Sequence, residues 1–455
     1  MEQITNIDKR LEQLGYQPQL RRRLHVWHVV GLALALISPT VTVFLLATAL
    51  FSQSGTFAIG AIFIISLVVI LIMLIIAELG AMYPVTGGVY SLTQRVLPGP
   101  FMWVIAFNVL VIGLSFLAIT CLGFAPFLKN LISGFAVPDR VIAILVLMLA
   151  TAISLIKVEL GAIINAILIV VECMAIGTLL AAGFFHPHQS LSEVLIHPSR
   201  LEGLHLVPVS ASLMLATLPG AFYMVAAPEI VLGFSEELVG DAKTLVRAVV
   251  VTVLLALSLI LIPLTAAVIA APDLVSFLES PTPVVYSVQQ AFGNKTAFII
   301  NLCICIALFT AMIATLMYFP RLLFAMGRDG MGWSEFTYLV SSLNRFSVPG
   351  AAILIIAFIA FLLLFVSALN WLVAFGGTLL TIQYFIVGLM GLWSRIKFPQ
   401  ELRPYRMPFW PILPIIVILF TTFVLGNQET QYLVSSLLLD TGAVLAWFVK
   451  NRFSS

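Results

Sequence analysis

PGAFYMVAAPEIVLGFSEELVGDAKTLVR, residues 219–247, is the stretch that decides how the rest of the chain is interpreted. It begins as an apolar run typical of a membrane helix, but Pro228 and Glu229 interrupt the run in its middle. A proline inside a helix removes a backbone hydrogen bond and bends the axis. Within a bilayer such a break is tolerated only where it is buried in protein or lines a watery cavity, and a carboxylate at that depth marks a functional site by default. The stretch therefore predicts a discontinuous membrane helix with Glu229 at its break.

The composition places the whole chain in a membrane. Of its 455 residues, 61% are hydrophobic and 9% are charged, whereas a soluble domain carries roughly 25% charged residues. The net charge of +2 indicates no nucleic-acid partner. The four cysteines all lie in apolar segments and are interpreted as packing residues, so the sequence predicts neither a metal site nor a cofactor.

The apolar runs predict an all-α integral membrane protein with twelve spans. A polar segment, residues 1–25, precedes the first span and ends in three arginines. The predicted spans lie near 27–50, 57–82, 100–127, 139–156, 160–185, 209–234, 244–271, 296–325, 349–367, 370–392, 410–426 and 430–449.

The basic residues support this count and give an orientation. With an inside N-terminus, the four basic residues Lys129, Arg140, Arg200 and Lys295 fall on the outer side, and the other 18 of the 22 fall inside. This asymmetry is what the positive-inside rule describes. We therefore expect a multi-pass protein of a cell (inner) membrane with both termini in the cytoplasm.

Two spans are interrupted at corresponding places. The first contains ISPTVT at residues 37–42, and the sixth contains AAPE at 226–229. An odd number of spans, five, separates them, so they cross the bilayer in opposite directions. Broken helices at matching positions of two inverted halves are the best sequence indication of a transporter's binding site. The alternative is a pair of ordinary proline kinks.

Three connecting loops carry a family resemblance. They are AELGAMYPVTGGVYSLTQRVLPG (77–99), FSEELVGDAKTLVRAV (234–249) and PRLLFAMGRDGMGWSEF (320–336). Together they resemble the amino acid–polyamine–organocation (APC) transporter superfamily, and residues 14–44 look more like its amino acid/choline/GABA permease branch.

The resemblance implies a five-plus-five inverted repeat with discontinuous helices 1 and 6. The first repeat would be 26–208, the second 209–395, and 396–455 would hold helices 11 and 12. Substrate would bind where the two broken helices cross, and rocking of one bundle against the other would give alternating access.

The candidate substrate-binding residues follow from the breaks and from polar residues in spans that line the family's pocket. Half-helix ends expose amides and carbonyls that suit the charges of an amino acid or amine. Many APC members carry Gly-x-Gly in span one where this chain has Thr40 and Thr42, whose side chains narrow the site although their hydroxyls can donate hydrogen bonds. This departure leaves room for an amine, or for a substrate whose carboxylate lies elsewhere. The candidates are Ile37, Ser38, Pro39, Thr40, Val41, Thr42, Asn108, Tyr223, Met224, Val225, Ala226, Glu229, Thr310 and Thr315. For Tyr223 the alternative is core packing, and for Asn108 and the threonines of span eight it is hydrogen bonding between helices.

Charged residues divide into two further groups. Glu172 in span five and Glu229 are candidates for proton coupling, because burial favours the neutral acid. A counter-ion for a cationic substrate, or half of a sodium site, stays open for Glu172. Candidate gating residues at the inner mouth are Glu78, Arg95, Glu236, Arg328 and Asp329. Topology anchoring is the alternative for this second group.

The sequence thus predicts a secondary active transporter and no enzyme. We expect a proton-coupled symporter or exchanger for an amino acid or small amine. A polyamine or amine antiporter is the runner-up, and a transport-dead sensor or a proton-translocating subunit represents another class. The expected partners are a small-molecule substrate, a proton and the lipid bilayer, with a homodimer as an option.

Overall fold

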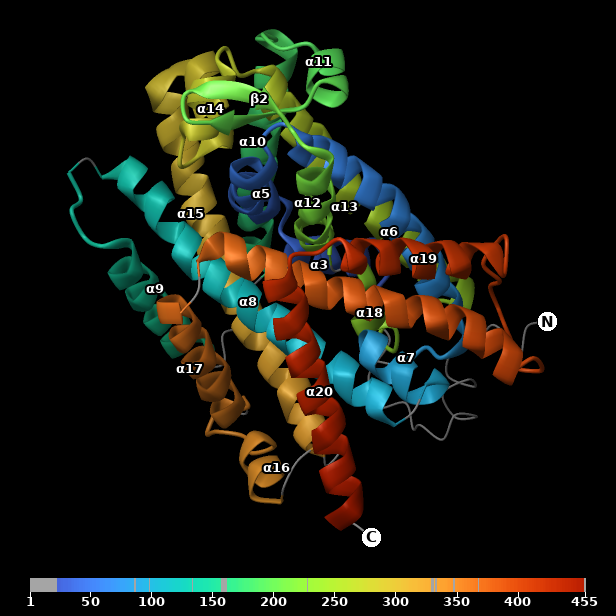
Figure 1. The fold of residues 1–455 in the computed structure, drawn as a ribbon. Coiled ribbons are helices and arrows are strands. Elements are labelled where there is room, and N and C mark those ends of the chain that lie inside the picture. The colour runs from blue at the N-terminus through green and yellow to red at the C-terminus, as the bar shows by residue number, and fades with distance from the viewer. Residues whose placement is uncertain are drawn as a thin grey trace.

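The computed structural model describes residues 23–453 apart from 86, 98, 133, 157–161, 227, 329–330, 332–333, 347 and 367. The described chain is a bundle of long helices, joined by short helices and one β-hairpin (Figure 1). The hairpin, α11 and α14 gather at one end of the bundle, and α16 lies near the other end together with the C-terminal end of α20.

The helices of the first part of the chain are α3 (Val26–Ile37), α4 (Pro39–Val41), the π-helix η1 (Thr42–Leu46), α5 (Ala47–Ser54), α6 (Phe57–Met82), α7 (Gly88–Val96), α8 (Pro100–Leu131), α9 (Asp139–Ser154), α10 (Ala162–Phe185) and α11 (Leu191–Ile196). After the hairpin follow α12 (Ala211–Met224), the 3-10 helix η2 (Pro228–Phe234), α13 (Ala242–Ile269), α14 (Leu274–Glu279), α15 (Pro283–Arg328), α16 (Ser334–Val340), α17 (Gly350–Val366), α18 (Leu369–Lys397), α19 (Ile412–Gly426) and α20 (Thr430–Phe453).

Helix occupies each of the twelve predicted spans. In the part of the chain that the structure describes, eight helices are long and apolar enough to cross a membrane, and three shorter apolar helices cover 170–185, 350–365 and 412–426. The all-α membrane class is confirmed. The count of twelve crossings and the inverted repeat stay predictions.

Both predicted interruptions are present. In the first span α3 ends at Ile37, and Ser38 adopts a left-handed conformation (φ 45°) before α4 begins at Pro39. In the sixth span α12 ends at Met224 and the chain resumes as η2 at Pro228. Proline at the start of each following segment is favourable, because its missing N–H would have no helical partner there.

A β-hairpin lies in the connection between the fifth and sixth predicted spans. β1 (Ser199–Glu202) pairs antiparallel with β2 (His205–Pro208). The hairpin lies on the turn between α5 and α6, where Thr56 N donates to Ser199 O at 2.9 Å. Gly55 (φ 57°) is required here, since a Cβ at that position would lie 2.1 Å from Ser199 O.

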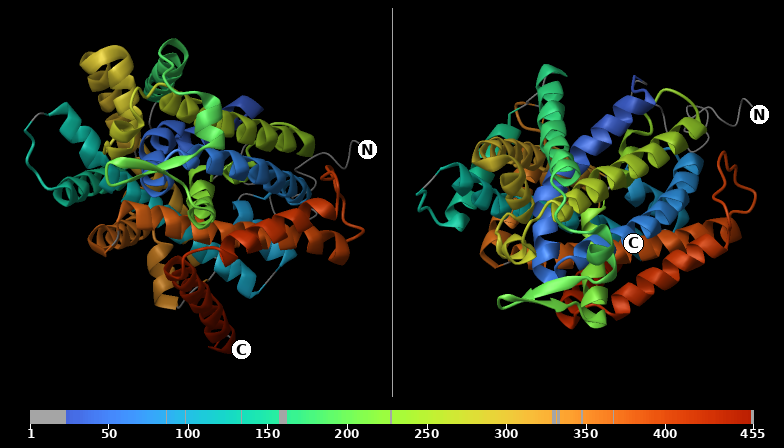
Figure 2. Two further views of the ribbon diagram at one scale, coloured as in Figure 1. Left: turned by 45° about the horizontal axis from the view of Figure 1, so that its top comes forward. Right: turned by 90° about the horizontal axis from the view of Figure 1, so that it is seen from above.

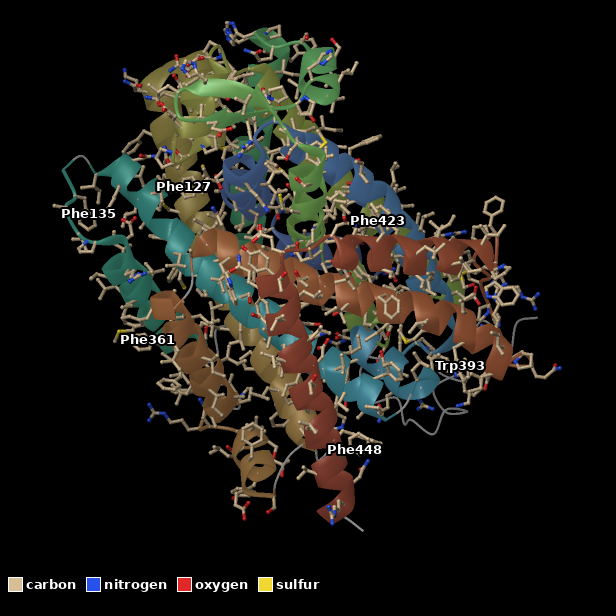
Figure 3. All side chains as sticks on the ribbon, viewed as in Figure 1. Phe127, Phe135, Phe361, Trp393, Phe423 and Phe448 are labelled. Carbon is tan, nitrogen blue, oxygen red and sulfur yellow. The ribbon has the colours of Figure 1, made fainter. Side chains whose placement is uncertain are left out.

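The two broken spans lie side by side in the interior. Figure 2 shows the N-terminal helices (blue) and the region around α12 (green) near the middle of the bundle. At one end, Leu24 forms a parallel β-bridge with Leu238, and Val239 N donates to Leu24 O at 2.7 Å. Large apolar side chains such as Phe423, Trp393 and Phe448 instead project outward from α19, α18 and α20, as expected for a surface facing lipid (Figure 3).

Candidate functional site

The break in span one leaves polar groups without their usual helical partners, and these groups are buried in the protein. All six residues 37–42 are buried. Thr42 Oγ1 donates to Ile37 O at 3.4 Å, so its hydroxyl satisfies a carbonyl at the break. Thr40 Oγ1 is buried and has no hydrogen-bond partner within the described chain. A hydroxyl buried in this state is available to a bound molecule.

Glu172 reaches the same break from α10. Ser38 Oγ donates to Glu172 Oε1 at 3.0 Å, and Glu172 is half-buried. The sequence predicted separate roles for these residues, substrate binding for Ser38 and proton coupling for Glu172. The structure brings them into direct contact.

The break in span six positions Glu229. Its carboxylate is 9% exposed. Gln383 Nε2 donates to Glu229 Oε1 at 3.2 Å, and Tyr384 Oη donates to Oε2 at 3.2 Å. Both donors come from adjacent positions of α18. Gln383 itself is 2% exposed, and its Oε1 has no hydrogen-bond partner among the described residues.

A cavity of about 90 Å³ lies beside Glu229. It is lined by the turn and start of α7, by α8, by the second half of span six, and by α15 and α18. The lining residues are Gly87, Gly88, Val89, Tyr90, Val109, Ile112, Ala226, Glu229, Ile230, Tyr318, Phe319, Leu322, Leu380 and Gln383. Among the described lining residues Glu229 is the one with a formal charge, so the cavity favours a small ligand that carries positive charge or donates hydrogen bonds.

Of the predicted substrate residues, Ala226 and Glu229 line this cavity, and the others lie elsewhere. Tyr223, Met224 and Val225 are buried, and Tyr223 Oη donates to Ile112 O at 3.0 Å. Thr310 and Thr315 donate to carbonyls of their own helix, with Thr315 Oγ1 2.7 Å from Ala311 O.

Asn108 is fully buried in α8, and neither polar atom of its side chain has a hydrogen-bond partner in the described structure. It lies against Asp440 of α20. Asn108 therefore faces a third acid rather than the cavity lined by its neighbours Val109 and Ile112.

The predicted gating residue Glu78 is the centre of a buried ion-pair network. Arg395 donates to Glu78 through Nε at 3.0 Å and through Nη2 at 2.6 Å, and Arg403 Nη1 donates at 2.9 Å. Met407 N donates a fourth hydrogen bond at 2.6 Å. Burial lowers the pKa of the Arg403 guanidinium, and the adjacent Glu78 carboxylate opposes that shift. The network ties the end of α6 to α18 and to the loop before α19.

In sequence, the other gating candidates belong to the three loops that carry the family resemblance. Arg95 is in the last turn of α7, and Glu236 follows η2. Arg328 ends α15, while its side chain and Asp329 lie outside the described residues. The loops 77–99 and 320–336 meet where Tyr90 Oη donates to Met331 Sδ at 3.3 Å.

Sequence reasoning missed Tyr384, Arg395, Arg403 and Asp440. The two arginines were counted only as inside-facing charge. Tyr384 and Asp440 gave a usable signal, because both are polar residues within apolar spans. Among the described residues no group of three His, Cys, Asp or Glu side chains could hold a metal ion.

The fold and the buried acids point to a transport protein, and comparison with known proteins identifies the family. A family profile described as amino acid permease matches residues 24–439. The chain belongs to the amino acid permease family. The resemblance to the APC superfamily is thereby confirmed, as are the expectations of a multi-pass membrane protein and of a transporter rather than an enzyme.

Two permeases are similar to this one at low identity. The branched-chain amino acid permease BcaP of Lactococcus lactis subsp. cremoris (strain MG1363) is 22% identical over 376 residues, 78% of each chain. The serine/threonine exchanger SteT of Bacillus subtilis (strain 168) is 23% identical over 362 residues, also 78% of each chain.

Proposed function

We propose that this permease is a proton-coupled symporter or exchanger for a small amino acid or amine. The observation that supports this function best is Glu229, a buried carboxylate at the break of span six, which lines a cavity whose other described lining residues carry no formal charge. Such a group attracts an ammonium or a proton, since either one removes the cost of a buried negative charge.

The other lining residues and the volume of the cavity limit the range of substrates. Val109, Ile112, Ile230, Leu322 and Leu380 give it apolar walls. At about 90 Å³ it is well below the roughly 300–1,000 Å³ of pockets for drug-sized ligands. A small zwitterion with an apolar or short polar side chain fits these walls, and the names of both relatives agree with that class. A polyamine or amine antiporter is the runner-up, since Glu229 would also hold a longer cation.

We assign proton coupling to Glu172 as well as to Glu229. Glu172 accepts a hydrogen bond from Ser38 at the break of span one, so its protonation state acts directly on that break. The division into repeats 26–208 and 209–395 followed by 396–455, the cytoplasmic termini and the inner-membrane location belong to the same proposal.

Reconstituted vesicles test the proposal. Purified protein in liposomes is supplied with radiolabelled neutral amino acids, amines or polyamines, with and without an inward proton gradient. We expect gradient-stimulated uptake of a neutral amino acid, and we expect Glu229→Gln to remove the stimulation while the protein stays folded. Glu279→Gln in the exposed part of α14 is the matched control and should behave like the wild type.

Three results would contradict the proposal in different ways. Wild-type pH dependence in Glu229→Gln would remove Glu229 from coupling. Uptake confined to polyamines would favour the antiporter. Substrate binding with no flux in either direction would favour a sensor.

A further inference from the structure

The side-chain amide of Gln383 is only half satisfied, in the wall of the cavity beside Glu229. Gln383 is 2% exposed, and its Nε2 donates to Glu229 Oε1 at 3.2 Å, whereas its Oε1 has no hydrogen-bond partner among the described residues. The same residue lines the cavity of about 90 Å³. A buried carbonyl oxygen without a partner is uncommon in a folded protein, because the cost of removing it from water is not compensated. Its position beside a cavity indicates a partner that binds there.

The packing of α18 against span six determines this position. A Cβ at Gly377 would lie 1.9 Å from Pro219 O, so glycine lets α18 approach α12 closely. Tyr384 follows seven residues later, which is close to two full helical turns, and therefore lies on the same face of α18. With its neighbour Gln383 it meets Glu229 just beyond the break. The amide is thus held on a continuous helix that is in close backbone contact with the broken one.

The carboxylate of Glu229 determines which end of the Gln383 amide is left without a partner. While Glu229 is ionised, the opposite orientation of the amide would bring two acceptor oxygens together at the 3.2 Å that a hydrogen bond now spans. The NH2 group therefore faces Glu229, and the carbonyl oxygen remains. A carbonyl only accepts hydrogen bonds, so a ligand that uses Gln383 Oε1 must donate one.

The charge and the acceptor in the cavity wall select differently. Within the described lining, the polar side chains are those of Glu229, Gln383, Tyr90 and Tyr318, and Tyr90 Oη already donates to Met331 Sδ at 3.3 Å. Attraction to the charge of Glu229 does not distinguish a primary ammonium from an N-methylated one, because both carry one positive charge. A hydrogen bond to Gln383 Oε1 does distinguish them, since each methyl group removes an N–H. A water that fills the empty cavity can hold the same place until an ammonium displaces it.

We propose that Gln383 is a specificity-determining residue whose Oε1 accepts a hydrogen bond from the substrate ammonium, while Glu229 supplies the opposite charge. The permease then selects primary ammonium groups over N,N-dimethylated ones, which keep a single N–H and use it on the carboxylate. This inference rests on the proposed function, because it requires the substrate amine to bind beside Glu229. It narrows the substrate to a compound with a free primary amino group.

Equilibrium binding to the purified full-length protein in detergent tests this contact. Isothermal titration calorimetry gives the Kd for L-alanine, L-serine and L-valine and for the N,N-dimethyl derivative of each. The ratio of the two Kd values measures the preference for the primary ammonium. Gln383→Met keeps the length of the side chain but has no carbonyl, so the parent amino acid should bind roughly 10- to 100-fold more weakly, as for a lost hydrogen bond to a charged group. The ratio should fall by about tenfold or more, because the steric cost of the methyl groups is present in both proteins and cancels.

Two further variants separate direct contact from an effect through Glu229. Tyr384→Phe also removes a hydrogen bond to Glu229 but leaves Gln383 Oε1 in place, so the Kd ratio should stay at the wild-type value. Gln383→Glu keeps an acceptor oxygen, and two adjacent buried acids share one proton, so this variant should retain the ratio. Gel filtration and thermal unfolding verify that each variant is folded, and Gln383→Leu replaces Gln383→Met if the latter is not.

The possible results separate this inference from the proposed function. A Kd ratio that is unchanged in folded Gln383→Met would overturn the role of Gln383 and leave the proposed function intact. An equal fall of the ratio in Tyr384→Phe would overturn it as well, because the preference would then depend on how Glu229 is held. If none of the three parent amino acids binds to the wild type, the proposed function itself is contradicted and the inference falls with it.

Discussion

The Glu78 network gives the sharpest prediction. Glu78 is fully buried and accepts four hydrogen bonds, three from Arg395 and Arg403 and one from Met407 N. Its partner side chains are 18% and 4% exposed for Arg395 and Arg403. Glu78→Gln keeps the shape of the side chain but removes the charge, so two buried guanidinium groups lose their counter-ion.

Removing one partner of a buried ion pair costs roughly 3–5 kcal/mol, because the remaining charge stays buried without compensation. We expect Glu78→Gln to lower the free energy of unfolding by that amount, measured by denaturant titration in mixed micelles. Arg403→Met removes the opposite partner. In a double-mutant cycle the two changes should be non-additive by about 1–3 kcal/mol, as for other residues in direct contact.

The exposed ion pair between Lys129 and Asp139 is the control. Its side chains are 37% and 55% exposed, and exposed pairs contribute roughly 0.2–1 kcal/mol. Asp139→Asn should therefore have a small effect. A loss below about 1 kcal/mol for Glu78→Gln, or additivity of the two network changes, would refute the reasoning. Transport by folded Glu78→Gln tests gating separately. If the ion pairs of the network break in every transport cycle, the substitution should change the transport rate. If they stay formed throughout the cycle, the rate should be unchanged.

Three further predictions concern the helices around the site. Ser38→Ala removes the donor to Glu172 and should cost about 1.5–3 kcal/mol, as for hydrogen bonds to charged groups, together with a changed pH profile of transport. Gly377→Ala places a Cβ 1.9 Å from Pro219 O, so thermal unfolding should show a loss of about 1–3 kcal/mol from overpacking of α18 against α12. Asp241→Ala removes the N-cap of α13 and should cost about 1 kcal/mol at neutral pH. Burial raises the pKa of Asp241, but hydrogen bonds from the first turn of α13 outweigh it and leave the pKa below its ordinary value. The cap therefore stabilises the fold above pH 4, roughly the unfolded pKa, and its contribution should disappear as the pH falls through the lower folded value.

The features that the sequence predicted correctly are local ones. A run of apolar residues long enough to span a bilayer leaves little alternative to a helix, because backbone groups have no other partner in hydrocarbon. The breaks were equally local, since proline acts on the preceding turn of its own helix. The prediction placed them at 37–42 and 226–229, and the structure breaks at Ser38 and after Met224.

The contacts that complete the site are distant in sequence, and no pattern in one chain reveals them. Glu78 lies 317 residues before Arg395, and Glu229 lies 155 residues before Tyr384. A carboxylate in an apolar run indicates that a partner exists, but many polar residues in other spans satisfy that demand equally well. The structure places Asn108 beside Asp440 and bonds Thr315 within its own helix, and substrate contact stays a prediction for both.

Glu229 and Glu172 differ in what their protonation would change. Glu229 accepts hydrogen bonds from Gln383 and Tyr384 on α18, a continuous helix. Glu172 accepts from Ser38, whose left-handed backbone is itself the break in span one. A carboxylate only accepts hydrogen bonds, whereas the neutral acid also donates one. Gain of a proton at Glu172 would therefore change its contact with the residue at the break. By thermodynamic reciprocity, any movement of the break must change the proton affinity of Glu172 in turn. This is the property that a coupling residue needs, and it makes Glu172→Gln the more informative companion of Glu229→Gln. If both substitutions remove the proton dependence of uptake, the acids act together, and if only Glu172→Gln does so, Glu229 serves the substrate amine.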